Sequence, residues 1–151
     1  MASPFGALRL YAAGDRLAGL YLPGRPAPSG VERRTPVLER TARQLAEYFA
    51  GRRRTFEIEL AIDGTAFQRE VWDALLAIPY GETRSYGELA RALGRPAASR
   101  AVGAANGANP ISILVPCHRL IGTGGALTGY AGGLAMKRGL LDLERGGRDV
   151  S

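Results

Sequence analysis

Residues 111–119 read ISILVPCHR and contain the only cysteine, Cys117, and the only histidine, His118, of the 151-residue chain. The apolar run Ile111–Val115 is rich in β-branched residues and is followed by proline, so it predicts a buried strand that ends in a turn. One candidate nucleophile therefore lies beside one candidate base in shielded surroundings. A buried free cysteine is usually inert unless a base or a cation lowers its pKa, so these residues alone leave core packing and catalysis equally open.

The composition of the chain limits its class. A chain of 151 residues can bury a hydrophobic core and form one or two small domains. A single cysteine permits no internal disulfide, and one cysteine with one histidine cannot supply a four-ligand zinc site, so we expect no metal and no cofactor. No apolar run approaches the roughly 18 to 20 residues that span a bilayer, and the N-terminus lacks a charged segment leading into an apolar stretch. These features predict a soluble cytoplasmic protein without membrane contact.

The formal net charge of +6 is concentrated in one segment. Residues 83–138 carry seven basic side chains and one acid, Glu88, whereas the charges of the two flanking segments cancel. The basic residues of the segment are Arg84, Arg91, Arg95, Arg100, Arg119, Lys137 and Arg138. A basic patch confined to one region is typical of a nucleic-acid surface. The alternative is a solvated arginine-rich face, because 19 of the 20 basic residues are arginine, as a GC-rich genome alone would produce.

The first 62 residues carry patterns typical of a small α+β domain. Two β-rich runs within Phe5–Leu22 flank residues 13–15 and predict a hairpin. The proline-rich residues 23–35 predict a loop. Residues 55–61 alternate between apolar and polar side chains, which predicts a strand.

One helix is expected between the loop and that strand. Thr35 followed by Pro36 is typical of a helix start, and the helix should run to about Ala50. Its apolar stripe comprises Leu38, Ala42, Leu45 and Phe49. Residues 62–64 mark the end of this unit, so we predict domains at 1–62 and 63–151.

Three short helices are expected from residue 65 onward. Thr65 and Ser85 are each followed three residues later by Gln or Glu, a capping box that marks a helix start. The first helix ends at 79–81, and a third is expected over about 97–106 with Gly107 as its stop. Two short helices joined by a turn, the second carrying arginine, indicate a helix-turn-helix.

The third helix is unusual because almost all its side chains are small. Between residues 97 and 108 only Arg100, Val102 and Asn106 are larger than serine. A helix that reads bases in the major groove normally presents several long hydrogen-bonding side chains. This helix therefore suggests sequence-independent docking, as in a minor groove where a wedged side chain unstacks bases. The alternative is a small-residue helix packed tightly inside the core.

These segments together resemble the O6-alkylguanine-DNA alkyltransferases, the methylated-DNA–protein-cysteine methyltransferases. Residues 113–121, ILVPCHRLI, resemble the active-site signature of that family. Further similar segments follow in the expected order: IPYGET (78–83), SYGELA (85–90), RAVG (100–103), NP (109–110), GYAGG (129–133) and residues 137–144. The resemblance covers about residues 65–146, and the N-terminal unit resembles the family only in length, predicted elements and position.

The resemblance implies a fold and a chemistry. The fold would be α+β, with a small ribonuclease H-like α/β domain followed by a mostly helical domain with a winged helix-turn-helix. Cys117 would attack the alkyl carbon on guanine O6 and keep the alkyl group, so that each molecule acts once. His118 would be the base, acting through a water because neighbouring side chains in an extended segment point to opposite sides. Glu144 would orient the imidazole, although without the family resemblance it would be interpreted as an ordinary solvated acid.

The resemblance also implies that the partner is double-stranded DNA, bound by a monomer that flips the alkylated base out of the stack. Arg100 would fill the gap left by the base, and Tyr86 would contact the base and its 3′ phosphate and protonate the leaving guanine. The remaining residues expected at the DNA are Ala101, Gly103 and Ala104. The residues expected at the substrate pocket are Asn109, Arg119, Leu120, Tyr130, Ala131 and Gly132. The alternative for both tyrosines is partly buried packing.

The sequence departs from the family at two places and leaves two other functions open. Ala131 stands where some relatives have serine, so only its backbone amide could contact O6. The N-terminal unit lacks the cysteines and histidines that bind zinc in some relatives. A lesion-binding sensor would recruit other repair factors without alkyl transfer, and a cysteine hydrolase would turn over without DNA. The presence of Cys117 favours transfer, which is expected for O6-alkylguanine and also for O4-alkylthymine.

Overall fold

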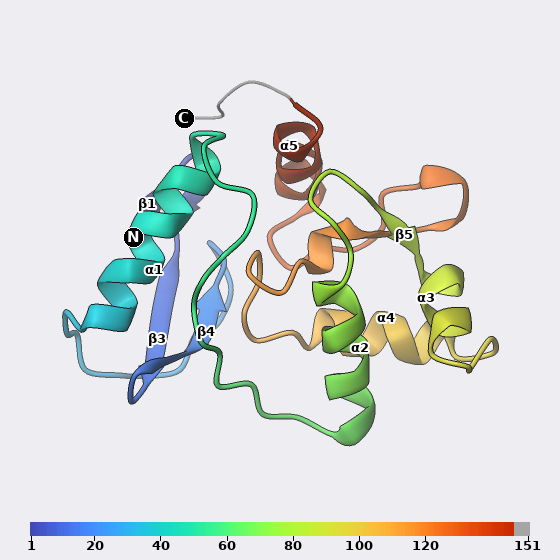
Figure 1. The fold of residues 1–151 in the computed structure, drawn as a ribbon, viewed down its shortest axis with the longest axis horizontal. Coiled ribbons are helices and arrows are strands. Elements are labelled where there is room, and N and C mark those ends of the chain that lie inside the picture. Colours follow the sequence, from blue (N-terminus) through green and yellow to red (C-terminus); the bar gives the residue numbers. More distant parts are fainter. Residues whose placement is uncertain (147–151) are drawn as a thin grey trace.

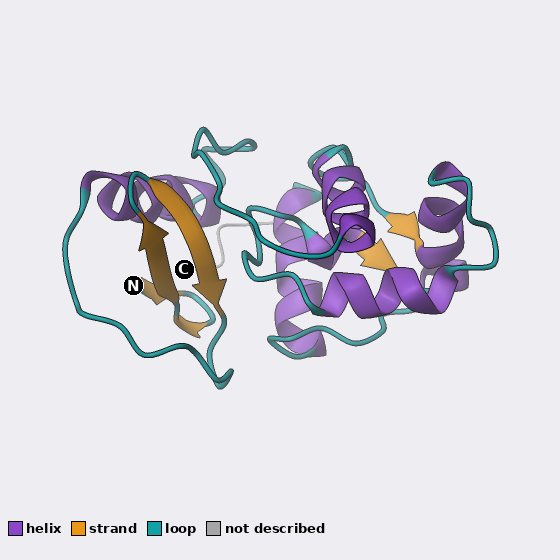
Figure 2. Cartoon of the chain, turned by 90° about the horizontal axis from the view of Figure 1, so that it is seen from below, coloured by secondary structure: helices purple, strands orange, loops and turns teal. Residues whose placement is uncertain are grey.

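The computed structural model describes residues 1–146, which form a strand-and-helix lobe and a helical lobe (Figures 1 and 2). The N-terminal lobe contains β1 (Ala2–Ser3), β2 (Gly6–Ala7), β3 (Arg9–Ala13), β4 (Arg16–Tyr21) and α1 (Pro36–Phe49). The C-terminal lobe contains α2 (Ala66–Leu76), β5 (Arg84–Ser85), α3 (Tyr86–Ala92), α4 (Ser99–Gly107), β6 (Leu120–Ile121) and α5 (Leu134–Glu144), with short 3₁₀ helices at Cys117–Arg119 and Thr123–Gly125. None of the helices within residues 1–146 is long and apolar enough to cross a membrane. Residues 147–151 of the predicted C-terminal domain lie outside the described residues.

The N-terminal hairpin and its helix form as the sequence predicts. β3 and β4 pair in antiparallel fashion, with an irregularity in register between Tyr11 and Ala12. The Thr35 hydroxyl accepts a hydrogen bond of 3.3 Å from the amide of Leu38, and Pro36 occupies the first helical position, so the start of α1 is confirmed. α1 packs against both strands, alongside which it lies in Figure 2.

The buried face of α1 differs from the predicted stripe. Leu45 and Phe49 are buried as expected, whereas Leu38 and Ala42 are only partly buried. Three polar side chains complete the buried face, namely Thr41, Gln44 and Tyr48. Their spacing of three and four residues places them on one side of the helix. A search for apolar periodicity cannot detect a polar buried stripe, and this is why the prediction missed it.

Residues 55–61 are extended but do not form the predicted strand. Their apolar side chains are half-buried and their polar ones mostly exposed, as the alternation predicts. Backbone pairing with β4 occurs only at Leu17, which bonds to the residues on either side of Leu60. Farther back, the Gln44 side chain accepts from the Glu57 amide at 2.9 Å and donates to its carbonyl at 3.5 Å. A side chain therefore satisfies backbone groups that the prediction assigned to strand pairing.

The helix-turn-helix is built from α3 and α4. Both predicted capping boxes are present, at Thr65 before α2 and at Ser85 before α3. α4 begins at Ser99, slightly later than expected, and runs through Gly107 instead of stopping before it. β5 pairs in parallel with β6, which ties the start of α3 to the segment that follows Cys117.

The strand predicted at Ile111–Val115 is wrong, although its residues are buried. The Val115 amide donates back to the Ile111 carbonyl at 3.0 Å, and Ile113 has a φ of +74°, a conformation that β-branched residues rarely adopt. Asn109 stabilises this turn by donating to the Val115 carbonyl at 2.8 Å and accepting from the Ile111 amide at 2.9 Å. Cys117 then begins a 3₁₀ helix, so the expectation of extended backbone at Cys117 and His118 is also wrong. Side-chain hydrogen bonds from Asn109 hold the segment in a turn, and its pairing with a strand is confined to a bridge between Ile111 and Leu20 of β4.

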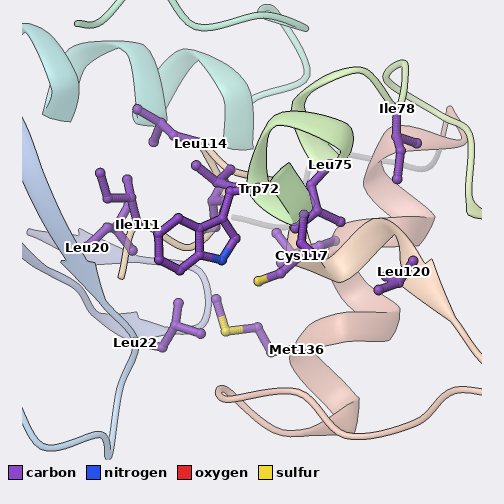
Figure 3. Close-up of a cluster of buried hydrophobic side chains, with 14 of the residues drawn as sticks. Leu20, Leu22, Trp72, Leu75, Ile78, Ile111, Leu114, Cys117, Leu120 and Met136 are labelled. Atoms are coloured by element: carbon purple, nitrogen blue, oxygen red, sulfur yellow. The ribbon is translucent and has the colours of Figure 1, made fainter. Parts of the chain in front are cut away.

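One hydrophobic core includes residues of both lobes. Figure 3 shows Trp72 of α2 between Leu20 and Leu22 on the hairpin side and Leu75 and Cys117 on the helical side. Trp72 is almost fully buried, and its indole N–H donates to the Ala105 carbonyl of α4 at 2.9 Å. The core therefore fixes α4 relative to the segment that carries Cys117.

Trp72→Phe should lower the free energy of unfolding by about 2 kcal/mol, because it removes a buried hydrogen bond and part of the aromatic volume. Urea denaturation followed by far-UV circular dichroism measures this, since the variant lacks the only tryptophan of the chain. Leu134→Ala is the control, because Leu134 is about half exposed on α5. Equal stability of Trp72→Phe and the wild-type protein would contradict this account of the core.

Candidate functional site

Cys117 lies at the start of the 3₁₀ helix with its side chain buried. Burial raises the pKa of its thiol, while hydrogen bonds with the Asn109 and Ser112 side chains and the charge of Lys137 offset part of that rise. The thiol is therefore protonated at neutral pH in the free protein. A reaction at Cys117 needs a base that accepts this proton.

His118 is the candidate for such a base, and Glu144 sets the orientation of its ring. Both side chains are buried, and His118 Nε2 lies 2.7 Å from Glu144 Oε2. An ionised carboxylate can only accept, so Nε2 carries the hydrogen and Nδ1 of the neutral ring carries the lone pair. Burial lowers the pKa of His118, against the opposing effect of Glu144, which keeps the ring neutral. Nδ1 has no hydrogen-bond partner within residues 1–146, Cys117 included, so a bridging water is needed to link it to the thiol.

Glu144, at the end of α5, is held by Arg119 as well as by His118. Arg119 Nε donates to Oε1 at 2.8 Å and its guanidinium nitrogen Nη2 donates to Oε2 at 3.0 Å, while Nη1 donates to the Ile78 carbonyl at 2.7 Å. Burial tends to raise the pKa of Glu144, but the hydrogen bonds from His118 and Arg119 and the charge of Arg119 outweigh it and hold the pKa at about 2. Glu144 is therefore a buried carboxylate, and its interpretation as a solvated acid is wrong.

A hollow of about 300 Å³ opens over Cys117. The residues that line it are Arg25, Tyr86, Gly103, Asn106, Gly107, Asn109, Ser112, Cys117, Gly129, Tyr130 and Ala131. It therefore brings together α3, α4, the 111–117 turn and the loop before α5. A larger hollow of about 490 Å³ lies between α1 and residues 57–59, but Cys117 does not line it. The smaller hollow is the candidate site.

The two predicted tyrosines, Tyr86 and Tyr130, line this hollow, and their hydroxyl groups differ in hydrogen bonding. Tyr86 is half-buried, and its hydroxyl lies 2.9 Å from the hydroxyl of Thr128. The hydroxyl of Tyr130 is buried without a hydrogen-bond partner in the part of the chain that the structure describes. Burial raises the pKa of Tyr130 well above its ordinary value, so it remains a donor. An unpaired buried donor at the edge of a hollow is positioned to bind a ligand.

Three residues predicted at the pocket do not line the hollow. Arg119 points to Glu144 and the Ile78 carbonyl instead. Leu120 is buried beneath it, with its carbonyl bonded to Lys137 at 2.6 Å. Gly132 packs against Met136, because a Cβ there would lie only 2.5 Å from the Met136 sulfur.

α4 presents its smallest side chains to solvent. Arg100, Ala101 and Ala104 are exposed and Gly103 is half-buried, whereas Val102 and Ala105 of the same helix face the core. Arg100 makes no hydrogen bond or ion pair with residues 1–146. Gly103 faces Tyr86 of α3, because a Cβ there would lie 3.5 Å from the Tyr86 ring, an ordinary contact distance. The four α4 residues predicted to dock DNA therefore lie on the side of the helix away from the core, whereas Tyr86, the fifth, lies on α3.

Two residues at the site were not predicted. Tyr48 of α1 donates a hydrogen bond of 2.5 Å to Glu144 Oε2. Lys137 of α5 is fully buried and donates to the carbonyls of Leu120 and Thr128 at 2.6 and 2.8 Å. The sequence offers one signal for Lys137, which is the only lysine among 20 basic residues. Lysine suits this position because its compact ammonium group can donate to two carbonyls in a confined space.

The chain matches two related family models. Residues 1–62 match the ribonuclease-like domain of 6-O-methylguanine DNA methyltransferase, and residues 66–146 match the DNA binding domain of the same family. The methylated-DNA–protein-cysteine methyltransferase of Mycobacterium tuberculosis is 51% identical over 146 residues, 95% of this chain and 88% of the relative. The protein of that name from Methanosarcina acetivorans is 61% identical over 103 residues, 68% of this chain and 66% of the relative.

Solved structures agree with the sequence comparisons. The crystal structure of Mycobacterium tuberculosis OGT in complex with DNA superposes with a TM-score of 0.93 at 48% identity and covers 99% of this chain and 94% of that chain. A crystal structure of the O6-methylguanine methyltransferase of the same organism gives a TM-score of 0.82 at 49% identity, with coverage of 97% and 90%. The predicted α+β fold, with its ribonuclease-like and helical DNA-binding domains, is confirmed. The chain belongs to the 6-O-methylguanine DNA methyltransferase family.

Proposed function

We propose that this chain repairs O6-alkylguanine in double-stranded DNA by moving the alkyl group irreversibly to Cys117. The observation that carries the proposal is the buried thiol at the base of a hollow, with a histidine–carboxylate pair behind it and a smooth helix face beside it. The sulfur would form a bond to the alkyl carbon while the bond from that carbon to O6 breaks, and guanine would leave protonated. No group in the site can remove the thioether, so each molecule acts once.

The proton path follows from the histidine tautomer. The thiol proton passes through a water to Nδ1 of His118, and Glu144 stabilises the imidazolium through Nε2. Because burial raises the pKa of Cys117 and lowers that of His118, the free protein keeps both groups neutral. Ionisation of the Cys117 thiol is then favoured only when the hollow holds a substrate whose alkyl carbon the thiolate can attack.

The face of α4 supports docking in a DNA groove without base reading. Ala101, Gly103 and Ala104 allow close approach of the backbone, and Arg100 projects from the same face into the space left by a flipped nucleotide. Tyr86 lies between this face and Cys117, where its hydroxyl can protonate the leaving base. Flipping out of a paired duplex costs a few kcal/mol, which a mispaired alkylated base reduces.

The hollow supports recognition of a planar base. Tyr130 and the backbone at Ala131 lie at its wall and can donate to the base, while Asn109 keeps the turn before Cys117 in shape. Leu120 and Gly132 act beneath the wall, and Arg119 acts through Glu144. O4-alkylthymine presents a similar alkoxy group and is proposed as a second substrate.

The setting of the reaction follows from its chemistry. A site that depends on one free thiol favours the reducing cytoplasm. We propose that the protein binds duplex DNA as a monomer, with a division into domains at residues 1–62 and 63–151, and needs no metal or other cofactor.

The transfer itself predicts a mass increase of one methyl group after incubation with duplex containing O6-methylguanine. Intact mass spectrometry and peptide mapping should place it on Cys117 with a limit of one per molecule. Cys117→Ser should bind the duplex but gain no mass. Binding by the wild-type protein without any mass change would favour a lesion sensor, and release of methyl product over many turnovers would favour a hydrolase.

Arg100→Ala should separate docking from chemistry. We expect transfer from duplex DNA to slow about tenfold or more, because the extruded base is no longer replaced in the stack. Transfer from the free base O6-benzylguanine should change much less, because no base is flipped. Arg43→Ala, which removes an exposed arginine from α1 outside the basic segment 83–138, is the matched control. Equal losses on both substrates would show that Arg100 has a structural role.

His118 predicts a dependence of stability on pH. Its pKa in the folded protein is lowered below 6.5, so the unfolded chain binds a proton that the folded chain does not. The free energy of unfolding should therefore fall by about 1 kcal/mol between pH 7.5 and 5.5. Urea denaturation of the wild-type protein and of His118→Gln measures this, because the chain has no other histidine. The same fall in both proteins would contradict a neutral buried His118.

A further inference from the structure

The Glu144 carboxylate receives a hydrogen bond from outside the C-terminal domain. Oε2 lies 2.7 Å from His118 Nε2, 3.0 Å from the guanidinium nitrogen Nη2 of Arg119 and 2.5 Å from the Tyr48 hydroxyl. Tyr48 belongs to α1, 96 positions earlier in the chain. In Figure 1 the C-terminal end of α1 and helix α5 lie at the same end of the molecule.

We propose that Tyr48 is a positioning residue for alkyl transfer: its hydroxyl fixes the Glu144 carboxylate that orients His118, so the N-terminal domain is part of the reaction machinery. This inference rests on the proposed function and concerns a step within it.

The surroundings of Tyr48 favour this role over simple packing. Its side chain is fully buried, and its ring packs against Phe49, Phe56 and Tyr80 with centroid separations of 5.5, 5.4 and 6.2 Å. Phenylalanine would fill the same space without a polar atom. A buried hydroxyl is tolerated only with a partner, and here the partner is the ionised Glu144. Burial and the Glu144 charge keep the pKa of Tyr48 well above 10, so the hydroxyl remains a donor over the whole pH range of the reaction.

The hydroxyl controls both the geometry and the charge of Glu144. A carboxylate oxygen with three donors has its lone pairs committed, so the group cannot rotate away from His118 Nε2. The donated hydrogen bond also spreads the negative charge and limits how strongly Glu144 favours the imidazolium. The other ionisable groups around His118 are Arg119 and Lys137, which disfavour its charge. Loss of the hydroxyl therefore loosens His118 and raises its pKa.

Tyr48→Phe tests the proposal in the full-length protein. The rate constant of methyl transfer from O6-methylguanine duplex, measured in single turnover at saturating protein, should fall about tenfold. Affinity for the duplex should stay within about twofold, because Tyr48 is remote from the face of α4. The pH at which transfer reaches half its maximal rate should rise, since His118 remains protonated to higher pH.

Tyr80→Phe is the matched control, because its hydroxyl bonds to the Leu143 carbonyl at 3.4 Å beside the same network but not to Glu144. In the Glu144→Gln background, Tyr48→Phe should cause little further loss, as expected if it acts through Glu144. Equal losses for Tyr48→Phe and Tyr80→Phe, or independent losses in the double variant, would overturn the proposal.

A second measurement does not depend on transfer. The chain contains one histidine, so ¹⁵N-labelled histidine gives the tautomer and pKa of His118 directly by NMR. Tyr48→Phe should raise that pKa relative to the wild-type protein and Tyr80→Phe, and an unchanged pKa overturns the inference even if stability falls. Absence of transfer by the wild-type protein would instead refute the proposed function, which keeps the two failures distinct.

Discussion

The buried carboxylate of Glu144 requires donors from most of the molecule. Removing a carboxylate from water is unfavourable by several kcal/mol unless charge and hydrogen bonds replace the water. Here the replacement comes from α1 through Tyr48 and from the 3₁₀ helix through His118 and Arg119. Arg119 is in turn held by the Ile78 carbonyl at the end of α2. One charge therefore ties together α1, the end of α2, the active-site turn and α5.

That arrangement explains how an unreactive thiol can be made reactive on demand. Burial protects Cys117 by raising its pKa, which also keeps it from unwanted reactions. His118, the proposed proton acceptor, is already aligned by Glu144, with its lone pair on Nδ1, which has no hydrogen-bond partner within residues 1–146. Only a substrate that fills the hollow completes the arrangement. A protein that acts once benefits from a thiol that is unreactive without substrate, because a thiol consumed by a side reaction is lost permanently.

Local patterns predicted much of the fold because they depend on nearest neighbours. The capping boxes at Thr65 and Ser85 and the start of α1 at Thr35 each need only a few residues to form. The strand at Ile111–Val115 was predicted wrongly because its pattern of side chains cannot reveal that hydrogen bonds from Asn109 hold the segment in a turn. The strand predicted at 55–61 pairs only at a single bridge for the same kind of reason, because the Gln44 side chain bonds to the Glu57 backbone.

The amino-acid sequence alone determines that any thiol chemistry in this protein takes place at Cys117, because the chain has no other cysteine, and its motifs indicate the family. The tertiary structure decides the environment of those atoms. Glu144 could be interpreted as a solvated acid, and Tyr48 as one apolar residue among many, until α1 and α5 are brought together. The physical reason is that burial, tautomer and pKa depend on contacts between residues far apart in the chain, and no local pattern contains them.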